Sequence, residues 1–540
     1  MDRTAARMVA CIVLLSATAT PAVATANTVP QQSATFSHPT IVAAYPDPIA
    51  DGDTGEFVVL DIPEAADTTS YSFTDGETTI SLSNVTEHGR IALSATPDHA
   101  RTNTDATVVG VASLSLANGG ERLQIRRNDT VVDRAVYRDT EEGQVATWNG
   151  TRIRWAPIGA TDRPVVRAED GTVRAFVLPD APTVPTDTLR GAEQRILLAG
   201  YTLTSDRVVD ALLAAHERNV TVRVLLEGQP VGGRTRRGAR SLDRLVAAGI
   251  EVRLLGGAHA RYEYHHAKYA VVDDRALVLT ENWKPSGTGG HSSRGWGVRT
   301  NQTEVVDGLA ATFRADAGGR DAIPWDRFRR GRTFEDGERS TANYSQRVAP
   351  ATVAIEETTL LVTPDNAQGR LVETLDRAND SIDVMQVTVG YESDLAAALR
   401  QAARRGVAVR LLLSNAWYVR EDNRALAERF REWASANDAP LTVRLADPGG
   451  RYGKIHAKGA VVDDRRVVLG SLNWNEQAAT SNREVVLLLG GAAIADYYGS
   501  VFDADWQGGR SQIPYGLLGA VAGCLGLAVI VGRKISFERR

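Results

Sequence analysis

The sequence predicts a duplicated α/β domain that follows an all-β sandwich, and three observations indicate this fold class. Six short blocks from the first part of the chain return later in the same order and at a near-constant offset. Within each copy, continuous apolar strands alternate with helices, which is typical of a sheet covered on both faces. The region before the duplication instead has short alternating strands separated by Gly, Asp and Asn turns. A chain of 540 residues is long enough for about three domains of this kind.

The two ends of the chain have the composition of targeting segments. Residues 1–26 combine a basic start, a short apolar run and a small-residue ending, which predicts a secretory signal peptide. Residues 515–532 carry no charge and are rich in Gly, Ala, Leu and Val, so they predict one transmembrane helix. The tail 533–540 is basic, and the positive-inside preference places it in the cytoplasm. We therefore expect a single-pass protein of the cell membrane with an extracellular body.

Residues 36–158 have the pattern of an all-β sandwich. The stretches GEFVVL at 55–60, LSLANG at 114–119 and VVDRAVY at 131–137 resemble the lamin-tail domain, which is an Ig-like sandwich. A domain of this kind is expected to bind a partner, and that partner is unknown.

The duplication predicts a first copy at 174–325 and a second copy at 359–514, joined by a polar linker at 326–357. Each copy runs from strand to helix to strand and ends in a hairpin, with expected strands at 266–273 and 275–280 and again at 456–463 and 466–471. The recurring blocks include FVLPD at 176–180 and LVTPD at 361–365, VTVRVLL at 220–226 and VAVRLLL at 407–413, HAKYAVVDD at 266–274 and HAKGAVVDD at 456–464, and FRAD at 313–316 and FDAD at 502–505.

The composition of the chain between its two terminal segments excludes several kinds of site. The two cysteines, Cys11 and Cys524, lie in the terminal apolar runs, so disulfide scaffolds, zinc–thiolate sites and cysteine nucleophiles are excluded between them. The net charge is −5 although both ends are basic, so the body is acidic and is not a generic binder of polyanions. Only five lysines occur, because arginine fills nearly every other basic position. Two of these five stand in the duplicated H-x-K segments.

Those segments predict phosphodiester chemistry. Residues two apart on a strand share a face, so His266 projects with Lys268, and His456 with Lys458. Facing each other, the copies would place two imidazoles and two ammonium groups around one anion. One imidazole can attack phosphorus while the other protonates the leaving oxygen. The lysines, with the asparagines Asn282 and Asn473, would stabilise the equatorial oxygens, so no metal and no cofactor are expected.

This pattern resembles the phospholipase D superfamily, whose signature is H-x-K-x4-D followed by G-S-x-N. The second copy matches in full, and Glu484 follows it downstream; the matching residues are His456, Lys458, Asp463, Gly470, Ser471 and Asn473. The first copy matches at His266, Lys268, Asp273 and Asn282. The first copy departs from the signature at two places. Thr280 and Glu281 take the place of Gly-Ser, in a segment that is one residue shorter, and Gly295 or Trp296 stands at the position of Glu484.

The resemblance implies a role for each residue. His266 would be the nucleophile supported by Glu484, His456 the general acid, and Glu281 a replacement acid for His456. The aspartates would tie each motif down. The resulting catalytic set is His266, Lys268, Asp273, His456, Lys458 and Asp463, and the substrate-binding set is Asn282, Ser471, Asn473 and Glu484.

Three functions remain open from the sequence. The first is a phospholipid enzyme acting by hydrolysis or by phosphatidyl transfer, similar to cardiolipin synthase, since the expected membrane helix begins where the second copy ends. The second is a metal-independent nuclease of the same superfamily, favoured only by arginines in a Gly-rich loop at 232–240 and disfavoured by the acidic body. The third is a non-catalytic adhesion or scaffold protein, favoured by the altered first motif.

Overall fold

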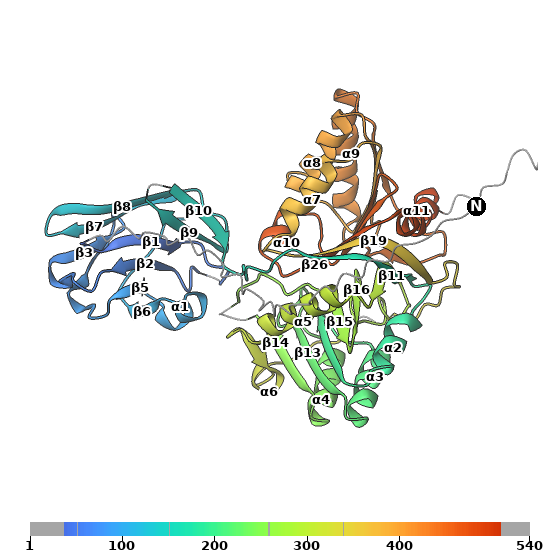
Figure 1. The fold of residues 1–540 in the computed structure, drawn as a ribbon, viewed down its shortest axis with the longest axis horizontal. Helices are drawn as coiled ribbons and strands as arrows, with labels where there is room; N and C mark the ends of the chain where they lie inside the picture. The colour runs from blue at the N-terminus through green and yellow to red at the C-terminus, as the bar shows by residue number, and fades with distance from the viewer. Residues whose placement is uncertain (1–36, 51, 151, 257–259, 338–339, 509–540) are drawn as a thin grey trace, which may run out of the picture.

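The computed structural model describes residues 37–508 except 51, 151, 257–259 and 338–339. It has a strand-rich N-terminal region and a larger α/β body, which lie side by side in Figure 1. The expected signal peptide (1–26), the expected transmembrane helix (515–532) and the tail (533–540) lie outside the described residues.

Two sheets of mainly antiparallel strands form the N-terminal region, in the strand orders β10-β9-β1-β2-β5-β6 and β4-β3-β7-β8. Alternating apolar side chains from both sheets, such as Leu60, Phe73 and Ile125, are fully buried in one core between them. The elements are β1 (Thr40–Tyr45), β2 (Phe57–Ile62), β3 (Tyr71–Thr74), β4 (Thr79–Ser81), β5 (Gly89–Ser94), α1 (Pro97–Asn103), β6 (Thr107–Gly110), β7 (Gly120–Arg127), β8 (Thr130–Arg138), β9 (Gln144–Asn149) and β10 (Arg152–Pro157). The lamin-tail resemblance of this region stays a prediction.

The first copy forms the lower part of the body in Figure 1. Helices form where apolar residues recur every three to four positions: Val208, Val209 and Leu212 bury one face of α3. The elements are β11 (Val166–Leu178), α2 (Thr183–Arg190), β12 (Arg195–Gly200), α3 (Asp206–Glu217), β13 (Thr221–Glu227), α4 (Arg236–Ala247), β14 (Glu251–Leu255), β15 (Tyr269–Val272), β16 (Arg275–Leu279), β17 (Ser293–Thr300), α5 (Thr303–Ala317), β18 (Ala322–Pro324) and α6 (Trp325–Phe328).

The second copy repeats this order in the upper part of the body (Figure 1). Ser393 caps α8 by accepting the backbone N–H of Ala396, as expected for a serine at a helix start. The elements are β19 (Ala351–Val362), α7 (Ala367–Asp376), β20 (Ser381–Gln386), α8 (Asp394–Arg404), β21 (Ala408–Leu413), α9 (Arg420–Ala436), β22 (Leu441–Leu445), β23 (Lys454–Ile455), β24 (Gly459–Val462), β25 (Arg466–Gly470), α10 (Glu476–Thr480), β26 (Val485–Gly490) and α11 (Ala492–Gln507).

One continuous mixed sheet joins the copies. In each copy three strands run parallel, β12-β13-β14 and β20-β21-β22, and the hairpin strands pair antiparallel beside them. The long strands β11 and β19 pair antiparallel from Val166–Leu360 to Ala175–Ala351, and this pairing connects the two half-sheets. The copies are therefore related by an approximate twofold that passes near this central pair.

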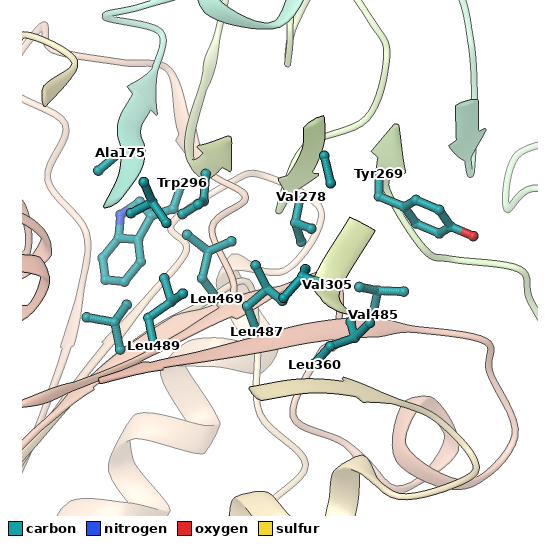
Figure 2. Close-up of a cluster of buried hydrophobic side chains, with 14 of the residues drawn as sticks. Ala175, Tyr269, Val278, Trp296, Val305, Leu360, Leu469, Val485, Leu487 and Leu489 are labelled. Atoms are coloured by element: carbon teal, nitrogen blue, oxygen red, sulfur yellow. The ribbon is translucent and has the colours of Figure 1, made fainter. Parts of the chain in front are cut away.

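A shared hydrophobic core fixes the copies against each other. Figure 2 shows Trp296, Val278 and Tyr269 of the first copy packed toward Leu469, Leu487 and other apolar side chains of the second. Trp296 is fully buried and stacks on Tyr498 with ring centroids 4.7 Å apart. Since this core draws on both copies, their relative position is set by packing rather than by a linker.

The structure corrects several expectations. The prediction of a single-pass membrane protein is wrong: no helix in the described part of the chain is long and apolar enough to cross a bilayer. The predicted linker 326–357 overlaps β19, which begins at Ala351, and the first copy starts earlier than 174 because β11 begins at Val166. The hairpin strands are also shorter than expected: β15 begins at Tyr269 and β24 at Gly459, just after the H-x-K residues.

Candidate active site between the two copies

Both histidines are held in place by the opposite copy. The backbone N–H of His266 donates to the carbonyl of Arg483 over 2.9 Å, and that of His456 donates to the carbonyl of Arg294 over 3.0 Å. Short strand β23 pairs with β17 at Arg294–Ile455, and His265 forms a bridge with Arg483. The two motifs thus meet at the twofold.

The His266 imidazole has a carboxylate partner from the second copy. Its Nδ1 lies 2.8 Å from Oε1 and 3.0 Å from Oε2 of Glu484, which is fully buried. Burial lowers the pKa of His266 to about 4, although Glu484 acts in the opposite direction. Burial would raise the pKa of Glu484, but His266 and Lys268 outweigh it and hold that pKa below its usual value. The carboxylate is therefore ionised, and it directs the Nε2 atom of a neutral His266 toward the site.

His456 is held differently. Its Nδ1 lies 3.1 Å from the carbonyl oxygen of Thr280 and 3.4 Å from Oε2 of Glu281. Burial and then Lys458 and Lys268 lower its pKa well below the usual value, and His266 contributes in the same direction. The two imidazoles are thus close enough to affect each other's charge. The lowered pKa leaves His456 neutral in the free protein, so it can act as a general acid only when a bound anion raises that pKa.

Four of the five lysines of the chain surround this site. Lys268 and Lys458 donate to the carbonyls of their own motif histidines, the latter over 2.9 Å. Burial lowers the pKa of Lys268 well below its usual value and that of Lys458 to about 8. Glu281 is buried among four lysines, which are Lys268, Lys284, Lys454 and Lys458. Burial raises the pKa of Glu281 to about 7. The cluster is a concentrated positive site in an acidic protein, which suits an anionic substrate.

The acid beside His456 comes from the segment that follows β16 and not from β17. Arg294 matches Arg483 in its backbone contacts, so Gly295 stands at the position of Glu484. A Cβ atom at Gly295 would lie 2.1 Å from Cγ of Glu281. Glu281 therefore fills the space that a glutamate at 295 would occupy, and it lies beside His456 in its place.

The Gly-Ser segment of the first copy is also shifted from its expected alignment. Thr280 Oγ1 accepts the N–H of Trp296 over 2.9 Å, just as Ser471 Oγ accepts that of Val485 over 3.0 Å. Thr280 is thus the counterpart of Ser471, and Leu279 that of Gly470. Ser471 also lies close enough to the Glu484 carboxylate to lower its pKa.

The remaining predicted residues divide into two groups. Asn282 is buried and Asn473 is half-buried in the turns that follow β16 and β25, and their Oδ1 atoms have no hydrogen-bond partner among the described residues. Asp273 and Asp463 lie at the hairpin turns instead and accept backbone N–H groups at 193–195 and 379–381. The two aspartates anchor strands β12 and β20 and are not part of the reacting cluster.

Two buried arginine clusters that the sequence did not predict lie behind the histidines. Arg483 donates to Asp365 over 2.6 Å and to Asp316 over 3.0 Å, and it lies over the ring of Tyr262. Arg294 makes the equivalent contacts with Asp180, Asp505 and Tyr452, at 2.6 Å, 2.8 Å and, to the ring centroid, 4.8 Å. Each arginine binds one aspartate of its own copy and one of the other. We call these two clusters the arginine latches.

Both copies are similar in sequence to known proteins. Residues 186–317 and 371–506 match the family model described as "Cardiolipin synthase, PLD-like domain". A mitochondrial cardiolipin hydrolase of Xenopus tropicalis is 34% identical over 143 residues, which are 26% of this chain and 62% of that protein. A phospholipase D of Rickettsia prowazekii (strain Madrid E) is 29% identical over 128 residues, 24% of this chain and 57% of that protein. The chain thus spans about six tenths of the length of these curated relatives.

Among solved structures, a phosphatidylserine synthase of Haemophilus influenzae Rd KW20 is 15% identical with a TM-score of 0.48, covering 63% of this chain and 88% of that one. The two stretches that match the family model fall one in each copy.

Proposed function

We propose, from the premise that each copy is a phospholipase D-like domain, that this protein is a phosphodiesterase or phosphatidyltransferase acting on phospholipid through a phosphohistidine intermediate. The observation that carries the proposal is the pair formed by His266 of the first copy and Glu484 of the second, 2.8 Å apart and buried. This pair requires both copies, and it orients one imidazole for attack.

The first half of the reaction follows from the two histidine environments. Nε2 of neutral His266 attacks phosphorus, a P–N bond forms, and the P–O bond to the leaving alcohol breaks. The anionic substrate raises the pKa of His456, so this imidazole is protonated in the complex, and it gives that proton to the leaving oxygen. Positive charge develops on the imidazole of His266, and the ionised Glu484 stabilises it.

The second half reverses these roles. Water or an alcohol loses a proton to His456 and attacks phosphorus, and the P–N bond to His266 breaks. Lys268 and Lys458 donate to the equatorial oxygens in both halves. A bound phosphate raises the pKa of both lysines, because a negative charge next to a buried ammonium favours its protonated form. Product identity depends on which acceptor enters, hydrolysis with water and transfer with an alcohol.

The test compares wild-type protein with His266→Asn and His456→Asn on phospholipid vesicles and on a soluble diester, bis(p-nitrophenyl) phosphate. We expect both variants to lose at least a thousandfold in kcat, because the removed groups form or break bonds to the substrate. Labelled substrate should leave a phosphohistidine on wild-type protein and on His456→Asn, but not on His266→Asn. Equal rates for wild type and His266→Asn would reject the proposal.

A plasmid-nicking assay in the absence of metal tests the nuclease alternative. Little in the described residues favours it, because the arginines at 234–240 are partly used internally. Arg234 is half-buried and donates to the carbonyl of Glu227, and Arg237 pairs with Asp206 over 2.5 Å. Nicking that is faster than phospholipid turnover would replace the lipid substrate with DNA while keeping the same chemistry.

A further inference from the structure

Exposed apolar side chains are rare in the described part of the chain, and their positions are not random. Five large hydrophobic residues are exposed there, and two of them, Val136 and Ile153, lie in the N-terminal region. The other three are Val231, Trp417 and Tyr418, which are 76%, 75% and 42% exposed. Single exposed hydrophobic residues need no explanation, but three in matched positions of a duplicated domain do.

The three residues occupy the same loop in each copy. Val231 lies between β13 and α4, and Trp417 and Tyr418 lie between β21 and α9. Strands β13 and β21 are counterparts, and each runs parallel to its neighbours, so both loops leave the carboxyl ends of a parallel sheet. Ligand sites of open α/β sheets form at that edge.

Each loop also contacts a residue that lies beside the site. The N–H of Val231 donates to the hydroxyl of Tyr201 over 2.6 Å, and the ring of Tyr201 contacts that of His266 with centroids 4.9 Å apart. In the second copy, the ring of Tyr418 covers Nζ of Lys454 at 4.9 Å, and Lys454 is one of the four lysines around Glu281. The exposed apolar groups therefore border the candidate site on both sides.

We propose that Val231, Trp417 and Tyr418 form an apolar rim that inserts into a phospholipid bilayer surface and brings the site to the head-group level. The inference rests on the proposed function, because a phosphorus atom in a bilayer is reached only if the mouth of the site touches that surface. Trp and Tyr favour the boundary between head groups and acyl chains, where an apolar ring meets a polar edge. The lysines behind the rim are placed to attract anionic head groups.

The experiment separates surface binding from catalysis. The full-length chain in a His266→Asn background, which leaves the lipid unaltered, is sedimented with vesicles of phosphatidylcholine and phosphatidylglycerol in equal parts. Trp417→Ala should weaken binding about tenfold, as expected for an inserted aromatic side chain, and addition of Val231→Ser should weaken it further. Val136→Ser is the matched control, because it removes an equally apolar exposed side chain far from the site, and it should bind like the parent.

A second measurement keeps the inference distinct from the proposed function. With His266 restored, Trp417→Ala and Val231→Ser should cleave bis(p-nitrophenyl) phosphate within twofold of wild type. Brominated acyl chains should quench the tryptophan fluorescence of the parent, and Trp417→Phe should lose most of that quenching while still binding. The rim proposal would be refuted if the double variant Trp417→Ala/Val231→Ser bound vesicles within twofold of the parent. It would also be refuted if the parent did not bind vesicles. Failure of wild type to cleave any diester would instead overturn the proposed function.

Discussion

Glu484→Gln isolates the contribution of one buried charge to the proposed reaction. The substitution keeps the size of the side chain and an oxygen that can accept from His266 Nδ1, but it removes the negative charge at 2.8 Å. A hydrogen bond to a charged group stabilises by about 1.5–3 kcal/mol. That stabilisation grows as positive charge develops on His266 in the transition state. We therefore expect kcat to fall roughly 10- to 150-fold.

The assay is p-nitrophenol release from bis(p-nitrophenyl) phosphate, followed both in the first turnover and at steady state. The first turnover reports attack by His266, so it should slow by the same factor as kcat. Glu281→Gln is the matched control: His456 Nδ1 keeps the carbonyl of Thr280 at 3.1 Å, and the loss should be no more than several-fold. A Glu484→Gln rate within twofold of wild type, in a variant whose melting temperature is unchanged, would refute the reasoning.

Three further predictions follow from the buried charges. Arg483→Met should lower the free energy of unfolding by about 3–5 kcal/mol in urea titrations, because it leaves the buried carboxylates of Asp316 and Asp365 without their arginine. Arg294→Met should lower it by less, because Asp505 keeps Arg451 at 3.4 Å; an unchanged unfolding midpoint for Arg483→Met would contradict this. The value of kcat/KM for a soluble diester should fall as pH rises through about 8, since Lys458 is charged below that pH and neutral above it; a flat profile from pH 7 to 9 would show that this charge is not needed. Because four lysines supply the positive charge, EDTA should leave the rate unchanged, and a loss restored by a divalent cation would show that the lysines do not suffice.

The duplication was predictable because similar blocks of residues occur twice along the chain, in the same order. Blocks that recur at a near-constant offset must fold alike, and two H-x-K motifs in equivalent positions of a paired domain come together at a twofold. The contact between His266 and Glu484 required more than periodicity, since these residues are 218 positions apart. It followed from the resemblance to a known family.

The arginine latches show why other parts of the site were not predicted. Asp180, Asp365, Asp316, Asp505, Tyr262 and Tyr452 all lie in or beside blocks that the repeat analysis found. Arginine is normally a surface residue, and a sequence with this many arginines does not show which of them is buried between two acids. Asking which charged residues recur in both copies would have singled out Arg294 and Arg483.

The displaced acid was hidden by a one-residue difference in length. The shorter first segment suggested that Thr280 and Glu281 replace Gly-Ser, whereas the backbone pairing aligns Thr280 with Ser471. Side-chain volume then explains Glu281, which fills the space above Gly295. The sequence holds both residues, but only their distance in space shows that one compensates for the other.

The crowding of Gly295 against Glu281 restricts how the first copy can change over evolutionary time. A glutamate introduced at 295 would collide with Glu281, since even its first carbon would lie 2.1 Å from Cγ of that residue. Removal of Glu281 alone would leave a hole beside His456 and no nearby acid of the first copy in its place. Neither single substitution restores the arrangement of the second copy, because an acid at 295 needs the space that Glu281 occupies.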